Sequence, residues 1–319
     1  MDKRELLLAV IAGETTGRIP CGFWHHFSDD EKFAGASIRA HKEYFEAADP
    51  DMLKVMNEHM YQLDRKISRP EDWRKIQRQK FNDTPYVDFI EEFKAIRKEI
   101  PSDVPMLATI HGVFASGYHG TEERPGDHFS DPDNLVSRHL REDPESVCMG
   151  LRTIAETLAE LAVKLKQAGA DGIYYAALGG ERYRFTQEVL EKYVIPLDSY
   201  VIDAIRDAGL LSVLHICKDK VRLPSYSTVN ADIVNWAVHD CEYSLADGRN
   251  LFPGKTLLGG FDDRSGILVE GSADEIRAEA ERILAEAGRI KFILGADCTL
   301  PDDIEIWRVN TVQDWAAKK

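Results

Sequence analysis

Eight short apolar segments recur along this chain, separated by longer stretches with the periodicity of amphipathic helices. Strands that alternate with helices favour a parallel sheet, and eight such units are the number that closes a (β/α)8 barrel, or TIM barrel. We therefore expect an α/β fold with one barrel domain over residues 1–319. The expected strands are Ile19–Trp24, Met52–Met56, Val104–Ile110, Gly172–Ala177, Leu211–Cys217, Asp232–Ala237, Thr256–Phe261 and Lys291–Ala296.

For the segment Met52–Met56 a helix is the alternative to a strand. An open doubly wound sheet is the alternative fold, but no Gly-x-Gly-x-x-Gly motif follows the first strand. Helices are indicated by apolar periodicity over residues 145–168 and by the capping-box pair Ser272 and Glu275. We also expect Pro301 in the first turn of the last helix.

Composition and charge limit the partners of this chain. The net charge of −15 argues against nucleic acid and against an anionic membrane surface, because both require clustered Lys and Arg. No run of about 18 apolar residues is present, and residues 1–14 resemble an amphipathic helix more than a signal peptide. Five scattered cysteines suit a reducing compartment. We therefore expect a cytoplasmic protein.

Polar side chains follow the expected strands, and in a parallel barrel the carboxyl ends of the strands form the active-site face. His215 and Cys217 end the fifth strand and, being two residues apart, point to the same side. Imidazole nitrogen and thiolate sulfur are both zinc ligands. Cys298, after the eighth strand, is the candidate third ligand, although strands five and eight are not neighbours. The alternative is that Cys217 is an ordinary core cysteine.

Four segments resemble the uroporphyrinogen decarboxylase superfamily: "RIPCGFWHHF" at 18–27, "VIPLDSYVIDAIRDAGLLSVLHIC" at 194–217, "LLGGFDDRSGILVEGSADEIRAEAERIL" at 257–284 and "LGADCTLPDD" at 294–303. The resemblance implies a (β/α)8 fold. The superfamily contains metal-free decarboxylases and zinc methyltransferases such as methylcobamide:coenzyme M methyltransferase. The zinc pattern of that branch, His-x-Cys and a distant Cys, matches His215, Cys217 and Cys298.

Cobalamin-independent methionine synthase has a similar set of ligands with an added Glu. Near the corresponding position this chain has Ala237, with His239 two residues later. Either His239 is a fourth ligand, or the fourth position is open, as a catalytic zinc requires.

By this resemblance, we expect a zinc-dependent methyltransferase that moves a methyl group from a methylated corrinoid, carried by a partner protein, to a small-molecule thiol. Trp24, His25 and His26 would form an aromatic wall for that cofactor. A homodimer is expected by analogy alone. The first alternative is a metal-free decarboxylase, which fits less well because "WHHF" replaces the Arg-rich "RQAGRY" segment of that branch. The second is a non-catalytic corrinoid- or tetrapyrrole-binding protein.

Three further residues are candidates for catalytic roles, each with a structural alternative. Glu181 could orient a substrate or hold a helix start, and His111 could be a hydrogen-bonded strand end. Tyr175 is adjacent to Tyr174, so one of the two faces into the barrel and the other faces the helices. The candidate lid is the loop that carries His119, Gly126 and His128, for which an ordinary solvated loop is the default. Packing roles are expected for Cys21, Cys148 and Cys241.

Overall fold

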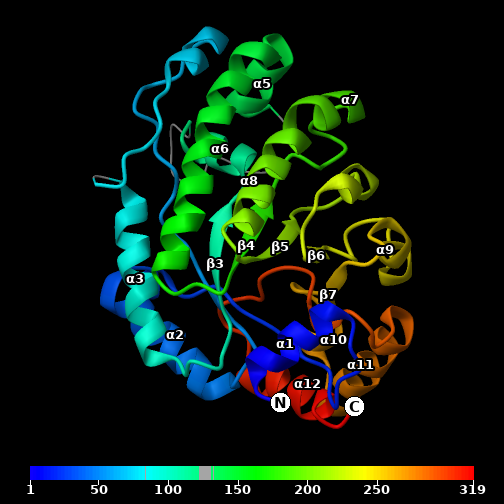
Figure 1. Cartoon of the computed structure of the whole chain (residues 1–319). Helices are drawn as coiled ribbons and strands as arrows, with labels where there is room; N and C mark the ends of the chain where they lie inside the picture. Colours follow the sequence, from blue (N-terminus) through cyan, green and yellow to red (C-terminus); the bar gives the residue numbers. More distant parts are fainter. Residues whose placement is uncertain (83, 122–130, 132) are drawn as a thin grey trace.

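The computed structural model describes residues 1–319 except 83, 122–130 and 132. Eight parallel strands form one sheet that is nearly closed into a barrel, with helices between the strands (Figure 1). All eight expected strands are confirmed, including the uncertain second one. Their bounds are β1 Cys21–Gly22, β2 Leu53–Val55, β3 Met106–His111, β4 Gly172–Ala177, β5 Leu211–Ile216, β6 Ile233–Trp236, β7 Thr256–Phe261 and β8 Phe292–Ala296.

The hydrogen-bonded order of the strands is β1-β8-β7-β6-β5-β4-β3-β2. Within the described residues no ladder joins β1 to β2, so the barrel has a seam between these strands. Asp51 spans the seam: it accepts hydrogen bonds from the Arg18 guanidinium, one of them 2.7 Å long, and from the backbone N–H of Cys21 at 2.9 Å. A buried carboxylate therefore holds together two strands that have no ladder between them.

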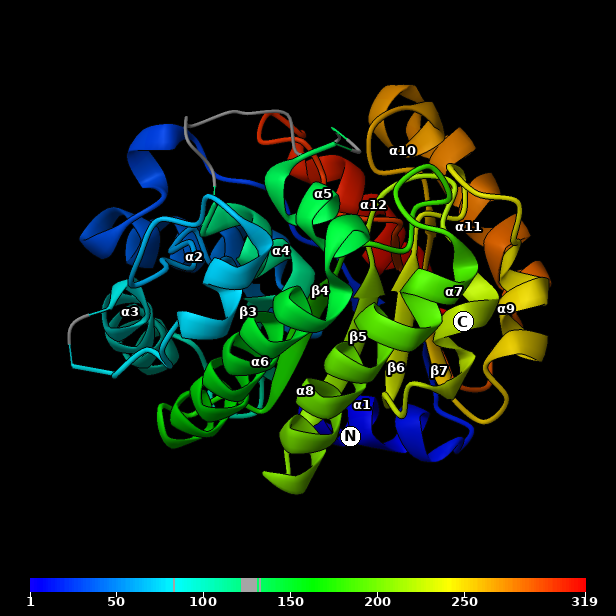
Figure 2. The ribbon, with the colours of Figure 1, turned by 90° about the horizontal axis from the view of Figure 1, so that it is seen from above.

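Helices surround the strands, as the view in Figure 2 shows. The α-helices are α1 Lys3–Ala12, α2 Ala34–Ala48, α3 Pro85–Glu99, α4 Val113–His119, α5 Leu135–Glu142, α6 Pro144–Gln167, α7 Gln187–Val189, α8 Ile195–Asp207, α9 Leu245–Leu251, α10 Gly266–Glu270, α11 Ala273–Ala287 and α12 Ile306–Ala316. The 3₁₀-helices are η1 Asp29–Glu31, η2 Pro70–Lys75 and η4 Leu223–Thr228, and the π-helix is η3 Leu190–Val194. The helices expected near 145–168 and after Ser272 are confirmed as α6 and α11, and Ser272 and Glu275 form the capping box of α11.

One helix prediction is wrong. Pro301 does not lie in the first turn of the last helix, because α12 begins at Ile306 with Glu305 as its N-cap. The backbone around residue 300 instead pairs with the segment that follows β1: Leu300 donates its N–H to the carbonyl of Trp24, and His26 donates to the carbonyl of Leu300. Pairing with the chain after β1 delays the start of the helix.

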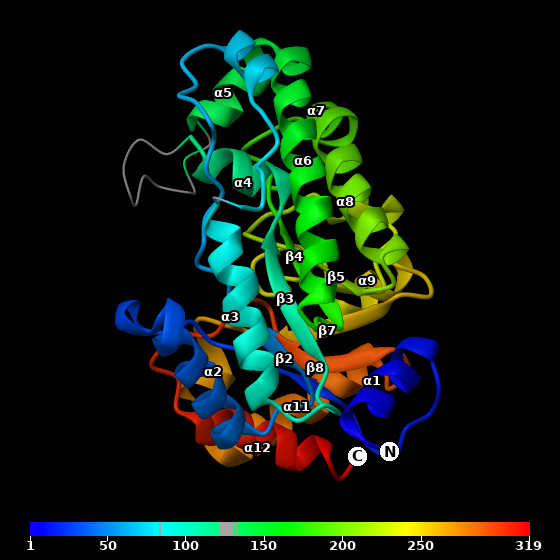
Figure 3. The ribbon, with the colours of Figure 1, turned by 60° about the vertical axis from the view of Figure 1, so that its left-hand side comes forward.

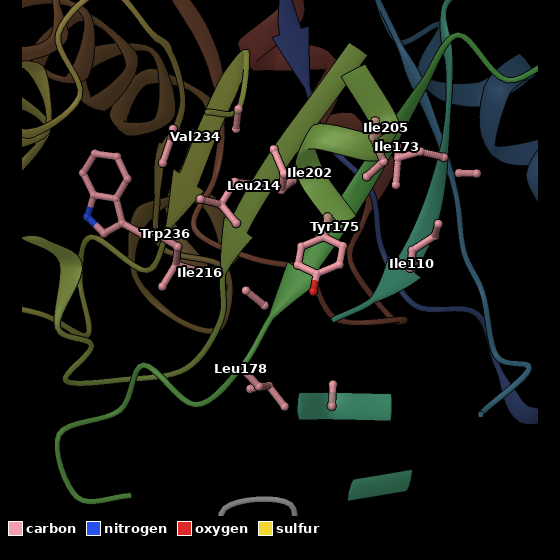
Figure 4. Close-up of a cluster of buried hydrophobic side chains, with 14 of the residues drawn as sticks. Ile110, Ile173, Tyr175, Leu178, Ile202, Ile205, Leu214, Ile216, Val234 and Trp236 are labelled. Atoms are coloured by element: carbon pink, nitrogen blue, oxygen red, sulfur yellow. The ribbon is translucent and has the colours of Figure 1, made fainter. Parts of the chain in front are cut away.

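Apolar side chains form two layers, one inside the barrel and one between the strands and the helices. The interior layer includes Trp24, Met52, Leu107, Tyr174, Val213, Ile233, Leu258 and Ile293. Leu6, Leu7 and Val10 of α1 pack against it, so this helix closes one end of the barrel. The outer layer is larger, and Figure 4 shows part of it where α8 covers β4, β5 and β6.

Both termini lie close together beside α1 and α12 (Figures 1 and 3). The backbone N–H of Ile19 also donates to the carbonyl of Ala316, which ties the start of the barrel to the last helix. In the described part of the chain, no helix combines the length and the apolar character needed to cross a membrane.

Candidate metal centre

Three potential metal ligands lie together at the carboxyl ends of β5 and β8. His215 is on β5, Cys217 follows that strand directly, and Cys298 lies two residues beyond β8. One ligand atom of each residue, the imidazole nitrogen or the Sγ, lies within 4.8 Å of the other two. The Sγ of Cys298 is 3.3 Å from Nε2 of His215. The barrel thus brings together residues that are 81 positions apart in the sequence.

Asn235 on β6 fixes the orientation of the His215 ring. Its Oδ1 lies 2.6 Å from Nδ1 of His215 and also accepts a hydrogen bond from the Tyr174 hydroxyl at 2.9 Å. The amide nitrogen donates to the carbonyls of Leu258 and Ala296, which determines which end of the amide faces the imidazole. Nδ1 of His215 must therefore carry the proton, and the lone pair of Nε2 points toward the cysteines.

The pKa values of the two cysteines are shifted in opposite directions. The pKa of Cys298 lies well below its usual value, chiefly because Cys217 donates a hydrogen bond to it, and the neighbouring His215 ring also lowers it. The pKa of Cys217 is raised well above its usual value by that same hydrogen bond and by burial. The hydrogen bond between the two sulfurs thus favours the thiolate form of Cys298, and a bound divalent cation would favour that form at both cysteines. One imidazole and two sulfurs are a donor set that fits zinc.

Lys54 on β2 is an unusual neighbour for this group. Its side chain points into the barrel and is only 3% exposed. Its Nζ lies 4.6 Å from the centre of the Tyr174 ring, and the same ring stacks with His215 at a centroid distance of 5.2 Å. Burial lowers the pKa of Lys54 to about 8, so the ammonium form still predominates at neutral pH.

His239 lies apart from the three clustered residues. Its Nδ1 is 2.9 Å from Oδ2 of Asp297, and its backbone N–H donates to the same oxygen at 2.8 Å. The hydrogen bond to Asp297 raises the pKa of His239. Among the described residues, the group with ligand atoms in mutual reach contains His215, Cys217 and Cys298 and not His239.

The expected aromatic wall divides into an interior part and a rim. Trp24 is buried inside the barrel, edge-on to Tyr174 with ring centres 5.0 Å apart. His25 is half-buried: its Nδ1 contacts the backbone carbonyl of His26 at 2.5 Å, and desolvation lowers its pKa. The side chain of His26 is 43% exposed, with Nδ1 3.8 Å from a carboxylate oxygen of Glu58. Only the two histidines are accessible at the rim.

The structure also places the three candidate catalytic residues. His111 ends β3, where burial lowers its pKa to about 3, and its Nδ1 has no hydrogen-bond partner among the described residues. Glu181 is fully buried, forms an ion pair with Arg184 at 2.9 Å and accepts a hydrogen bond from the N–H of Gly179. These contacts give Glu181 a structural role in the loop that follows β4.

Tyr175 lies on the outer side of β4, packed against α8 (Figure 4). Its hydroxyl donates to the Asp198 carboxylate at 2.5 Å and accepts from the N–H of Val113. The inward member of the tyrosine pair is therefore Tyr174. His119 ends α4, whereas Gly126 and His128 of the candidate lid lie outside the described residues. Cys21 is buried, and Cys148 and Cys241 are partly buried against the core.

Sequence reasoning missed two residues of this site, Asn235 and Lys54. Both interrupt otherwise apolar strands at inward-facing positions: Asn235 lies between Val234 and Trp236, and Lys54 between Leu53 and Val55. A polar residue within a strand that is buried on both faces was the available signal.

Solved structures share this architecture. The methyltransferase from Methanosarcina mazei superposes with a TM-score of 0.79 at 16% identity, covering 99% of this chain and 98% of the other. A B12-independent methionine synthase from Shewanella sp. W3-18-1 gives 0.61 at 16% identity, covering 95% and 96%. A putative vitamin-B12 independent methionine synthase from Listeria monocytogenes gives 0.60 at 13%, covering 95% and 98%. At these identities the similarity establishes the fold.

A search of curated proteins finds no match. The sequence model described as uroporphyrinogen decarboxylase (URO-D) matches residues 56–318, which is most of the chain and includes all three clustered residues. This chain belongs to the uroporphyrinogen decarboxylase family.

Proposed function

We propose that this protein is a zinc-dependent methyltransferase that moves a methyl group from a corrinoid, carried by a partner protein, to a small-molecule thiol. The observation that carries the proposal is the placement of one imidazole nitrogen and two sulfurs within 4.8 Å of one another. The proteins with similar folds include a methyltransferase, a methionine synthase and a putative methionine synthase, and they support the same class of reaction.

His215, Cys217 and Cys298 would hold the metal, which leaves a fourth position for the acceptor. When bound, zinc keeps the sulfur of a thiol acceptor in its nucleophilic thiolate form near neutral pH. The work of the protein is then to position the acceptor. Asn235 and Tyr174 hold the His215 ring in one orientation, and the buried Trp24 and Tyr174 keep water from the floor of the site.

The methyl donor would approach from the rim of the barrel, where His25 and His26 are accessible. Transfer from a corrinoid methyl group to sulfur requires the two reactants in line and close together, which is a positioning effect. His239, held by Asp297, and His111 remain candidates for contacts with the acceptor or with the donor. A homodimer, by analogy with relatives, also remains part of this proposal.

Decarboxylation is the second candidate, favoured by the family match over residues 56–318. It needs no metal, so the elemental composition of the purified protein separates the two functions. A methyltransferase should contain about one zinc per chain. A non-catalytic tetrapyrrole- or corrinoid-binding protein, the third candidate, would instead bind the pigment tightly without turning it over.

The test is Cys298→Ser, assayed for zinc content and for methylation of 2-mercaptoethanol by methylcobalamin. We expect the substitution to remove most of the zinc and the transfer activity, because one of the two thiolates is lost. The matched control is Cys148→Ser, whose sulfur lies on α6 near the carbonyl of Tyr193 and should not affect either measurement. A wild-type protein without zinc, or a Cys298→Ser protein with full zinc and full transfer, would exclude this function.

A further inference from the structure

Lys54 is a buried cation that the proposed chemistry does not yet use. On β2 the inward positions alternate with the outward ones: Leu53 and Val55 face the helices, while Lys54 pairs in register with Leu107 of the interior layer. A charged amine at this position loses its hydration, which is unfavourable unless a partner compensates. The charge thus requires a compensating group.

The contacts of Lys54 offer no such group. Its Nζ lies 3.2 Å from Sδ of Met56, 3.5 Å from Oγ1 of Thr299, and over the rings of Tyr174 and Trp24 at 4.6 and 5.4 Å. In the described part of the chain, no carboxylate forms an ion pair with it. Neutral contacts and ring faces stabilise an ammonium only partly.

Both cysteines of the candidate metal centre act on Lys54. Cys298, Glu58 and Cys217 are the groups whose charges favour the ammonium form of Lys54. Two contacts also link Lys54 to the candidate ligands: it lies near Thr299, which is adjacent to Cys298, and near the Tyr174 ring, which stacks with His215. Lys54 therefore packs against residues that adjoin or contact the candidate metal ligands.

Charge balance indicates what the lysine does. A divalent metal with two thiolates is neutral, and a thiolate in the fourth position gives the centre one net negative charge. We infer that Lys54 is a positioning residue that supplies the balancing positive charge, so that the centre prefers an anionic sulfur ligand over a neutral ligand. This inference rests on the proposed function, since it concerns the fourth position of the same metal centre.

The burial of Lys54 distinguishes this role from direct recognition of substrate. With 3% of its surface exposed beneath Tyr174 and Trp24, the ammonium cannot easily contact an acidic group on the acceptor. It acts through the field that it places on the metal centre. Such a field is strong where water is excluded, and it discriminates by ligand charge rather than by ligand shape.

The experiment uses the cobalt(II)-substituted full-length protein, because ligand binding to cobalt is visible in its absorption spectrum. The two probes are 2-mercaptoethanol, which binds as a thiolate and carries no acidic group, and imidazole, which binds as a neutral ligand. Each is titrated against wild type, Lys54→Met and Lys54→Arg. The control for loss of a distant charge is Lys98→Met, in the last turn of α3 on the surface.

For Lys54→Met we expect the dissociation constant of 2-mercaptoethanol to rise about tenfold or more, while that of imidazole stays within about twofold. Lys54→Arg should restore most of the thiolate affinity, and Lys98→Met should match wild type. Unchanged imidazole binding would also establish that the Lys54→Met protein is folded and holds its metal.

Equal effects of Lys54→Met on both probes, or no effect on either, would overturn the inference and leave the metal centre standing. Failure of the wild-type protein to bind either cobalt or zinc is a different result, because it would remove the proposed function together with the inference.

Discussion

At the scale of single residues, the geometry of the site depends on side chains that fix the orientation and the protonation of neighbouring side chains. Asn235 illustrates this, since its amide is used at both ends: Oδ1 faces His215 and Tyr174, and Nδ2 faces two backbone carbonyls. A ligand histidine whose second nitrogen is held in this way keeps one tautomer and one ring orientation. We therefore expect Asn235 to influence the metal affinity proposed for the site.

We predict that Asn235→Leu lowers zinc affinity by about 10- to 100-fold, because the His215 ring loses the partner that fixes its tautomer. Competition with a chromophoric chelator measures this affinity, on protein shown to be folded by circular dichroism. The control is Asn310→Leu on α12, whose amide contacts the carbonyl of Ala47 and the side chain of Gln313 and none of the candidate ligands. Wild-type affinity in folded Asn235→Leu would contradict the role assigned here.

His41 predicts a pH dependence of stability. Its Nδ1 faces the carbonyl of Ser37 at 2.7 Å and its Nε2 accepts the N–H of Met56 at 3.0 Å, so the folded protein holds the ring neutral. Burial lowers its pKa to about 4 from 6.5. Between these values the unfolded chain binds more protons, so acidification from pH 6.5 to 4 should lower the unfolding free energy by roughly 3 kcal/mol from this group.

Urea unfolding at several pH values measures this effect. The variant His41→Leu should be less stable overall but should show a smaller loss of stability across the same interval. The difference between the two curves isolates His41 from His111, whose pKa is also lowered. Parallel curves for wild type and variant would refute the assignment.

At the scale of elements, apolar runs located every strand, but the ladders are shorter than the runs. Residues 19–24 are apolar throughout, yet only Cys21 and Gly22 pair with β8. Hydrophobicity reports burial, whereas strand bounds depend on hydrogen-bond partners that a single sequence does not reveal. The same limit applies to Tyr174 and Tyr175. Both faces of a buried strand are apolar, so the sequence does not show which of two adjacent residues points into the barrel.

The site could be predicted where its residues carry unusual chemistry, as His215, Cys217 and Cys298 do. It could not be predicted for Asn235 and Lys54, whose importance depends on what lies across the barrel. His239 occupies a strand end as expected, but Asp297, two strands away in the sheet, holds its ring and its backbone. The barrel geometry decides which residues of different strands come into contact, and the local sequence around one residue does not show its partners on other strands.

Asp51→Ala tests the seam between β1 and β2. We predict a loss of about 2 kcal/mol in unfolding free energy, because the Arg18 guanidinium and the buried N–H of Cys21 both lose their acceptor. Urea denaturation measures the loss. The control is Asp29→Ala, whose partner Lys32 lies at the surface and whose removal should leave stability nearly unchanged. Equal stabilities of the two variants would show that Asp51 does not hold the seam.

At the scale of the whole molecule, a metal bound by β5 and by the segment after β8 would join two strands that are separated in the sheet by β6 and β7. A ligand that binds only the folded state stabilises it by mass action. Zinc should therefore act on global stability and not only on the site.

We predict that free zinc at about a hundredfold excess over its dissociation constant raises the melting temperature by roughly 4 °C. Differential scanning calorimetry of metal-free and zinc-loaded protein measures the shift. Cys217→Ser should abolish most of the shift, whereas Cys241→Ser should retain it. The same shift in wild type and Cys217→Ser would mean that zinc binds elsewhere.

The seam divides the wall of the barrel into two mechanically different parts. From β5 to β8 the strands form an unbroken, hydrogen-bonded arc, and the residues that would hold the metal lie at its two ends. Trp24 and Lys54 stand instead beside the break, next to β1 and on β2. A widening of the wall at the break would enlarge the space around the indole and the amine while leaving the spacing of His215 and Cys298 unaltered. We therefore expect a larger incoming molecule to be accommodated at the break, without a change in the distances among the three candidate metal ligands.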